Sequence, residues 1–199
     1  MLRIALVLVA APLLHAQFTI QPSTSENQSL QLKNGMLDAE GQTVEQLLQF
    51  AYHLQAGTVI GPAWIGEKNF DVHGAKSQLQ QALTEHFKLD CKRETRPMDV
   101  FVLKATPDAE ARLTSSGAVD TDGMSHIRGT NLSAESIARY LSSWLGKPVI
   151  DETGLHGQYA VDITWDANNS NNLIPAVERA GLRLEKDRRL VEALVVTEK

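Results

Sequence analysis

The chain of 199 residues is 43% hydrophobic, which is enough to bury a core as one domain or as two small ones. Its 24 acidic residues outnumber its 19 basic residues, and the formal net charge is −5. The basic residues form no stripe that would attract a phosphate backbone, so we expect no nucleic-acid partner.

The first 16 residues have the features of a secretory signal peptide. Arg3 precedes an apolar run over 4–14, and the small residue Ala16 follows. We expect cleavage after Ala16, which makes the mature protein periplasmic or secreted, with residues 17–28 as an N-terminal extension. No later segment is long and apolar enough to span a membrane, so no transmembrane segment is expected after cleavage. Cys91 is the single cysteine and cannot form a disulfide within the chain.

The next stretch, residues 29–104, predicts a first α+β repeat. A hairpin-turn dipeptide is followed by a capping box, an amphipathic helix, a second helix and a final hairpin. These features are carried by Asn34-Gly35, by Thr43 with Gln46, by the stripe Val44, Leu47, Leu48 and Ala51, by the stripe Leu79, Ala82, Leu83 and His86, and by 87–104.

Residues 105–117 read as a linker, and 118–199 then repeats the same order of elements. Asp122-Gly123 corresponds to Asn34-Gly35, and Ser133 stands at the N-cap position of an amphipathic helix. The predicted fold is therefore α+β, a tandem duplication of a small module with two helices packed on a mainly antiparallel sheet. The two repeats form either one continuous sheet or two separate cores.

The stretch TGLHG, residues 153–157, lies between two predicted strands of the second repeat. Its counterpart in the first repeat places Ile65 opposite Leu155 but lacks both Gly154 and His156. The stretch is therefore interpreted as a joint and not as a reactive loop. We expect a positive φ at Gly154, a buried Leu155 and a surface position for His156.

Motifs that carry known chemistry are absent. The sequence contains no HExxH, SxxK, GxSxG, CxxC or P-loop pattern. Asp71 and His73, two apart on a predicted strand, favour a solvated strand face over a metal-ligand pair. Asp151 and Glu152 favour an exposed strand end over a general acid and base. We therefore predict no catalytic, cofactor-binding or metal-binding residues.

Two tryptophans are candidate binding residues. Trp64 and Trp165 lie near predicted loops and would line a groove for a sugar or a peptide. Trp144 lies on the apolar stripe of a predicted helix and is expected in the core.

Four arginines are the other candidate binding residues. Arg93 and Arg96 lie at the predicted tip of the first final hairpin, and Arg188 and Arg189 lie at the equivalent tip of the second. If both tips face one side, they would meet an acidic partner or an envelope surface. The alternative is that both are solvated hairpin ends.

Three blocks of the sequence resemble a known family. They are Trp64 before Phe70-Asp71-Val72, the FKL and RET segments within 87–98, and GKPVIDETGLHG with the tyrosine that follows it. Over roughly residues 30–197 the chain resembles a family of soil-associated bacterial exported proteins that is defined by a domain of unknown function. Each half more distantly resembles the short N-terminal domains of secretins and TonB-dependent receptors. Some relatives carry the domain beside a membrane-bound sensor peptidase, which implies a binding or sensing role.

The sequence thus favours an exported, non-catalytic binding or sensing module of the cell envelope. Its partner would be an envelope protein or a glycan, bound through sheet edges, hairpin tips or the face between the repeats. The alternatives are an envelope hydrolase or carbohydrate-binding enzyme with carboxylates contributed by both repeats, and a purely structural envelope protein. Converging carboxylates in a deep pocket would favour the enzyme, and an open strand edge would favour the binder.

Overall fold

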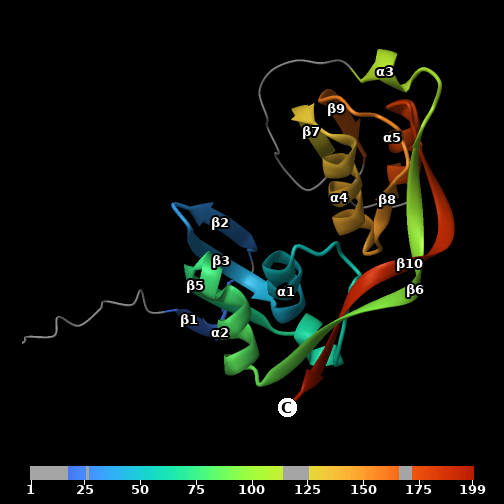
Figure 1. Ribbon diagram of the computed structural model, residues 1–199. Helices are drawn as coiled ribbons and strands as arrows, with labels where there is room; N and C mark the ends of the chain where they lie inside the picture. Colours follow the sequence, from blue (N-terminus) through green and yellow to red (C-terminus); the bar gives the residue numbers. More distant parts are fainter. Residues whose placement is uncertain (1–17, 26, 114–125, 166–171) are drawn as a thin grey trace, which may run out of the picture.

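Two lobes lie along a long ribbon of two strands (Figure 1). The computed structural model describes residues 18–25, 27–113, 126–165 and 172–199. The predicted signal peptide and the predicted turn at Asp122-Gly123 lie outside these residues. The ribbon consists of β6 (Leu89–Ala105) and β10 (Leu182–Glu198). Helices and mainly antiparallel strands are both present, so the predicted α+β class is confirmed.

The first lobe precedes β6 in the chain. Its elements are β1 (Thr19–Pro22), β2 (Ser29–Lys33), β3 (Met36–Thr43), α1 (Val44–Tyr52), β4 (Val59–Ile60), the 3-10 helix η1 (Ala63–Gly66), β5 (Asn69–Ala75), the 3-10 helix η2 (Lys76–Gln78) and α2 (Leu79–His86).

Local sequence signals account for several of these elements. Asn34 and Gly35 have φ angles of 52° and 78°, as a tight hairpin turn between β2 and β3 requires. The predicted capping box is confirmed, because the hydroxyl of Thr43 accepts from the Gln46 amide and the Gln46 side chain accepts from the Thr43 amide. The sheet order is β1-β5-β3-β2. The predicted N-terminal extension therefore contributes β1 to the first lobe.

The second lobe lies between β6 and β10 in the chain. Its elements are α3 (Ala109–Arg112), β7 (His126–Leu132), α4 (Ala134–Leu145), β8 (Val149–Asp151), β9 (Tyr159–Thr164) and α5 (Leu173–Arg179). Ser133 caps α4 through a bond from the Ser136 amide, as its position predicts. Ala109 and Leu113 fall within the predicted linker, yet both are buried in the core of this lobe. That part of the chain is therefore a packed segment and not a spacer.

The prediction that each repeat ends in its own hairpin is wrong. β6 and β10 pair with each other over their full length, from Leu182 opposite Ala105 to Glu198 opposite Leu89. The polar stretches that read as hairpin tips are the middle parts of two 17-residue strands. Four strands form this sheet in the order β4-β10-β6-β8, with β4 parallel to β10 and β8 parallel to β6.

Each end of the ribbon belongs to a different core. The first core includes Leu89, from the beginning of β6, together with Leu194 and Val196, from the end of β10. The second core includes the end of β6 and the beginning of β10. The predicted boundaries at 29–104 and 118–199 therefore do not separate the cores, because each lobe buries residues from both final strands. The two halves share an order of elements, and the duplication itself stays a prediction.

The lobes meet at the middle of the ribbon. We call this region the waist, formed by Thr95–Asp99 of β6 and their partners Arg188–Glu192 of β10. The loop after α1 contacts the second lobe there, since the Gln55 side chain accepts from the Val149 amide at 2.8 Å. A β-carbon added to Gly57 would lie 2.6 Å from the carbonyl oxygen of Gly146. The hydrogen bond from Val149 ties the two lobes together, and the glycine at 57 permits their close approach.

Candidate functional site

The three tryptophans do not form a groove. The indole nitrogen of Trp64 donates to Glu198 at 2.6 Å, and its ring packs 5.8 Å from Phe87. Trp165 is only 6% exposed, whereas Trp144 is 41% exposed. The expectation that Trp144 is buried and Trp165 partly exposed is therefore wrong. Their rings meet edge to face at 5.0 Å, which places Trp165 on the core side of the pair.

Two of the four candidate arginines hold the ribbon to the lobes. Arg93 forms an ion pair with Glu192, donates to the carbonyl of Tyr52 at 2.7 Å and lies 5.8 Å from the Tyr52 ring. Arg189 lies 3.3 Å from Glu152 and 3.0 Å from Asp187. These contacts satisfy both guanidinium groups within the protein. Their part in the structure is to fix β6 and β10 against α1 and β8.

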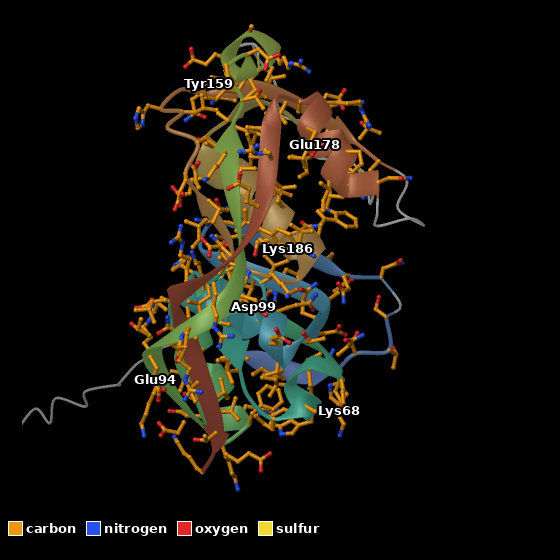
Figure 2. The ribbon with its side chains drawn as sticks, turned by 90° about the vertical axis from the view of Figure 1, so that its right-hand side faces the viewer. Lys68, Glu94, Asp99, Tyr159, Glu178 and Lys186 are labelled. Carbon is orange, nitrogen blue, oxygen red and sulfur yellow. The ribbon has the colours of Figure 1, made fainter. Side chains whose placement is uncertain are left out.

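The other two arginines, Arg96 and Arg188, line a cleft at the waist. The cleft comprises two cavities of about 450 Å³ and 290 Å³, which share the lining residues Asp99, Lys147 and Arg188. Figure 2 labels Asp99 and Lys186 on the ribbon at the level where the lobes meet. We call this region the waist cleft. Its lining residues are Gly57, Ile60, Arg96, Pro97, Met98, Asp99, Val100, Phe101, Gly146, Lys147, Pro148, Lys186, Asp187 and Arg188.

The waist cleft is cationic although the whole chain is acidic. It is lined by four basic side chains and two carboxylates, which leaves a surplus of two positive charges. The basic residues are Arg96, Lys147, Lys186 and Arg188, and the acidic residues are Asp99 and Asp187. A cleft that gathers one sign of charge raises the local concentration of ligands of the opposite sign.

The ion pairs inside the cleft are long. Arg188 lies 3.8 Å and Lys147 lies 3.9 Å from the carboxylate of Asp99. Both separations exceed a direct hydrogen bond, so neither cation is held tightly by its partner. Arg96 differs, because it donates to Glu94 at 2.9 and 2.7 Å. Lys147 and Arg188 are therefore the cations best placed to receive an external carboxylate.

An open strand edge borders the cleft. On β6, the Phe101 amide points away from β10 and donates to the Pro148 carbonyl at 2.9 Å. On β10, the Leu194 amide points away from β6 and donates to the Thr58 carbonyl at 2.9 Å. Because main-chain groups alternate along a strand, the amides of Lys186, Arg188 and Leu190 also face away from β6. Among the described residues, no main-chain group pairs with this edge of β10 between 184 and 192.

The edge of β6 on the other side is blocked. Pro97 lies at its middle and has no amide hydrogen to donate, a common protection of an edge strand. On β10, the Arg188 amide donates a hydrogen bond of 2.7 Å to the carboxylate of the preceding residue, Asp187. Leu190 is 72% exposed, the highest value among the large apolar residues described. β10 is therefore the strand of the waist that can accept a partner strand.

The residues considered for catalysis have structural partners. Asp151 accepts from the amide and hydroxyl of Thr153 at 2.9 and 2.7 Å, which closes a turn. Glu152 pairs with Arg189. His73 lies 3.8 Å from Asp38, and the Gly41 amide donates to Asp71 at 3.0 Å. The described residues contain no group of three or more His, Cys, Asp or Glu side chains arranged to hold a metal ion.

Two half-buried groups, Cys91 and Glu45, have raised pKa values, but neither is placed for chemistry. Burial raises the pKa of the Cys91 thiol, a change that a hydrogen bond from Tyr52 opposes. A raised thiol pKa lowers the fraction of reactive thiolate. Burial also raises the pKa of Glu45, against a hydrogen bond from Gln49 at 3.0 Å. Neither group lines one of the cavities described here.

The TGLHG joint matches two of its three expectations. Gly154 has φ 70° and His156 is exposed, as predicted. Leu155 is only half-buried, although it packs against the second core. The loop is ordered by its own hydrogen bonds, since the Leu155 amide donates to Thr153 and the Gly157 amide to the Tyr159 hydroxyl.

Sequence reasoning missed Asp99, Lys147 and Lys186. Lys147 comes from the loop between α4 and β8, and the other two come from strands whose pairing joins residues far apart in the chain. The four arginines predicted as binding residues lie on β6 and β10, the strands that line the waist cleft. No local signal indicated that β6 and β10 pair with each other, so no local signal placed Lys147 beside them.

Comparison with known proteins places the chain in a family. No curated protein and no solved structure matches it. No helix among the described residues is long and apolar enough to cross a membrane. The model of a family described as "Protein of unknown function (DUF3738)" matches residues 45–198, which include most of the first lobe and all of the described second lobe and ribbon. The chain belongs to this DUF3738 family of proteins of unknown function.

Proposed function

We propose that this protein is an exported, non-catalytic binding module of the bacterial cell envelope. Its ligand is an extended acidic segment of an envelope protein, and its site is the waist cleft. The observation that carries the proposal is the convergence of Arg96 and Lys147 with Lys186 and Arg188 in an otherwise acidic protein. Both halves of the chain supply these cations, so only the complete fold forms the site.

The open edge of β10 supplies the second part of recognition. An incoming strand would pair with the outward main-chain groups of Lys186 and Leu190, and acidic side chains on it would meet Arg188. Lys147 would add its charge across the face of the ribbon, where it reaches toward Asp99, the cross-strand partner of Arg188. Leu190 is exposed and lies two residues after Arg188, so it would give an apolar contact on the same face of β10, beside the acidic side chains of the partner. Main-chain pairing supplies affinity in this mode, and the side-chain contacts supply specificity.

The envelope location rests on the signal-like residues 1–16, which lie outside the described part of the chain. The resemblance to exported proteins, some of which carry this domain beside a sensor peptidase, supports a role in binding or sensing. The more distant likeness to domains of secretins and TonB-dependent receptors agrees with a small periplasmic α+β module. An acidic glycan is the rival ligand, since it would use the same cations without the strand edge.

The proposal is tested with a labelled short peptide of alternating Glu and Val, and with the same peptide in which Lys replaces Glu. Fluorescence anisotropy should show binding of the acidic peptide alone, with affinity that falls as salt rises. The double variant Lys147→Ala/Arg188→Ala should weaken binding about tenfold, because each exposed ion pair contributes up to roughly 1 kcal/mol. The matched control is Arg139→Ala, on the solvent face of α4. Equal binding by the two peptides would refute the proposal.

One observation favours the hydrolase as a second candidate. Asp99 and Asp187 come from different halves of the chain and line the same 290 Å³ cavity. Both carboxylates lie near cations, with Asp187 3.0 Å from Arg189, whereas a general acid needs an environment that keeps its proton. The variant Asp99→Asn separates the candidates. It should strengthen binding of the acidic peptide in a binder, and it should abolish turnover of an envelope polymer in a hydrolase.

A further inference from the structure

The second lobe contains a further cavity, which shares no lining residue with the waist cleft and is larger than either of the two cavities there. It has a volume of about 590 Å³ and lies between α3, β7, β9 and α5. We propose that this cavity, which we call the arginine pocket, binds a small amphipathic molecule with an anionic headgroup, either a carboxylate or a phosphate. Its size is within the usual range for small-molecule sites. The inference does not depend on the proposed function of the waist cleft.

Three guanidinium groups converge on the arginine pocket from three different elements. Arg112 comes from α3, Arg128 from β7 and Arg179 from α5. Arg112 also donates to the carbonyl of Arg179 at 3.1 Å, which ties α3 to the end of α5. Guanidinium groups present paired donors that match the geometry of carboxylate and phosphate oxygens.

The internal carboxylates account for two of the three charges. Arg112 lies 2.6 Å from Asp108, and Arg128 lies 3.1 Å from Asp162. Hydrogen bonds from Thr106 and Arg112 lower the pKa of Asp108, so this pair stays ionised at neutral pH. Arg179 donates to the Thr164 carbonyl at 3.3 Å, and within the described part of the chain it has no carboxylate partner. Counted over the described residues, the pocket therefore holds one guanidinium more than the carboxylates neutralise.

Much of the remaining lining is apolar, although Thr130 and Thr164 also line the pocket. Leu113, Val161 and Ala176 are buried members of the second core, and Ala160 and Ala180 complete the wall. The pocket is thus a gap at the edge of the core with cations at its mouth. A ligand with a charged head and a short aliphatic tail would satisfy both surfaces, whereas a purely ionic ligand would leave the apolar wall wet.

Three probes of equal chain length test this assignment by calorimetry: octanoate, octyl phosphate and octanol. At least one of the two anions should bind with an affinity about tenfold or more above that of octanol. The comparison of octanoate with octyl phosphate identifies the headgroup. Octanol that binds as tightly as the anions would overturn the anionic assignment, and an absence of binding by all three would overturn the site.

Variants locate the site on the arginine pocket. Arg179→Gln should weaken the better anion about tenfold, and Arg139→Gln, a helix arginine outside the pocket, should leave its affinity unchanged. NMR shift mapping on the unmodified protein does not depend on the folding of a variant. The largest shifts should occur at the amides of Gly129, Ala160 and Ala180. Shifts confined to the waist cleft, or unchanged binding by Arg179→Gln, would refute the proposal.

Discussion

Gly57 tests whether contact between the lobes stabilises the protein. Its φ is 75°, in the left-handed region, and an added β-carbon would lie 2.6 Å from the Gly146 carbonyl oxygen and 3.2 Å from the Lys147 α-carbon. For Gly57→Ala, the left-handed backbone costs roughly 1 to 2 kcal/mol, and the overlap with main-chain atoms costs about 1 to 3 kcal/mol more. We therefore expect a loss of about 2 to 5 kcal/mol in the free energy of unfolding.

The matched control is Gly154→Ala. Gly154 has φ 70°, but nothing lies within 4 Å of the added β-carbon, so only the backbone cost of roughly 1 to 2 kcal/mol applies. Urea unfolding of both variants isolates the contact between Gly57 and Gly146 as the difference. Equal losses in the free energy of unfolding would show that the two lobes can move apart at Gly57 without destabilising the protein. The waist would then not be a rigid contact between the lobes. A larger loss at Gly57 should also be accompanied by weaker binding of the acidic peptide.

Three further predictions concern the cores and the sheet of the first lobe. Residues 118–199 expressed alone should fail to fold, since β10 loses β6 and half of its buried side chains lose their core; a sharp thermal transition of that fragment would contradict the shared ribbon. Hydrogen bonds from Ser23 and then Gly41 lower the pKa of Asp71 below 3.8, so the stability it adds is present above that pH and is lost as pH falls through the folded-state pKa. Asp71→Asn should therefore destabilise the protein at neutral pH and flatten its acid sensitivity between pH 4 and the lower limit of folding, as measured by thermal melts across pH; an unchanged pH profile would assign the sensitivity elsewhere. Leu155→Ala should cost about 1 to 2 kcal/mol in urea unfolding, less than the roughly 2 to 5 kcal/mol of a fully buried leucine, and a neutral result would remove Leu155 from the core.

Local structure could be predicted because its causes are local. The turn at Asn34-Gly35 and the caps at Thr43 and Ser133 each depend on a few neighbouring residues, and each is present as predicted. The helices that follow have apolar stripes whose spacing indicates both their type and their buried face. These signals identified the α+β class and most of the elements.

The ribbon could not be predicted in the same way. Strands usually have five or six residues, so the polar stretch at Lys92–Arg96 within an apolar sequence resembles a turn. Here it is the exposed middle of a 17-residue strand, paired with residues about a hundred positions away. Pairing between distant segments leaves no periodic mark in the sequence of either one. The waist cleft depends on that pairing and was therefore invisible until the fold was known.

The exposures of Trp144 and Trp165 are the reverse of those predicted, for a physical reason. Trp144 lies on the apolar stripe of α4, but in its last turn, where its large ring packs on Trp165 and is only partly covered. Trp165 directly follows β9 and turns inward against the core. Position on a stripe indicates which side of a helix faces the core, whereas the burial of one side chain also depends on the residues that cover it.

Amide hydrogen exchange on the complex with the acidic peptide tests the central claim most directly. The account predicts that the peptide slows exchange at the outward amides of Lys186 and Leu190 on β10, with no change at the edge strand β2. Slowed exchange at β2 with unchanged β10, or binding that protects no amide of the waist, would contradict it.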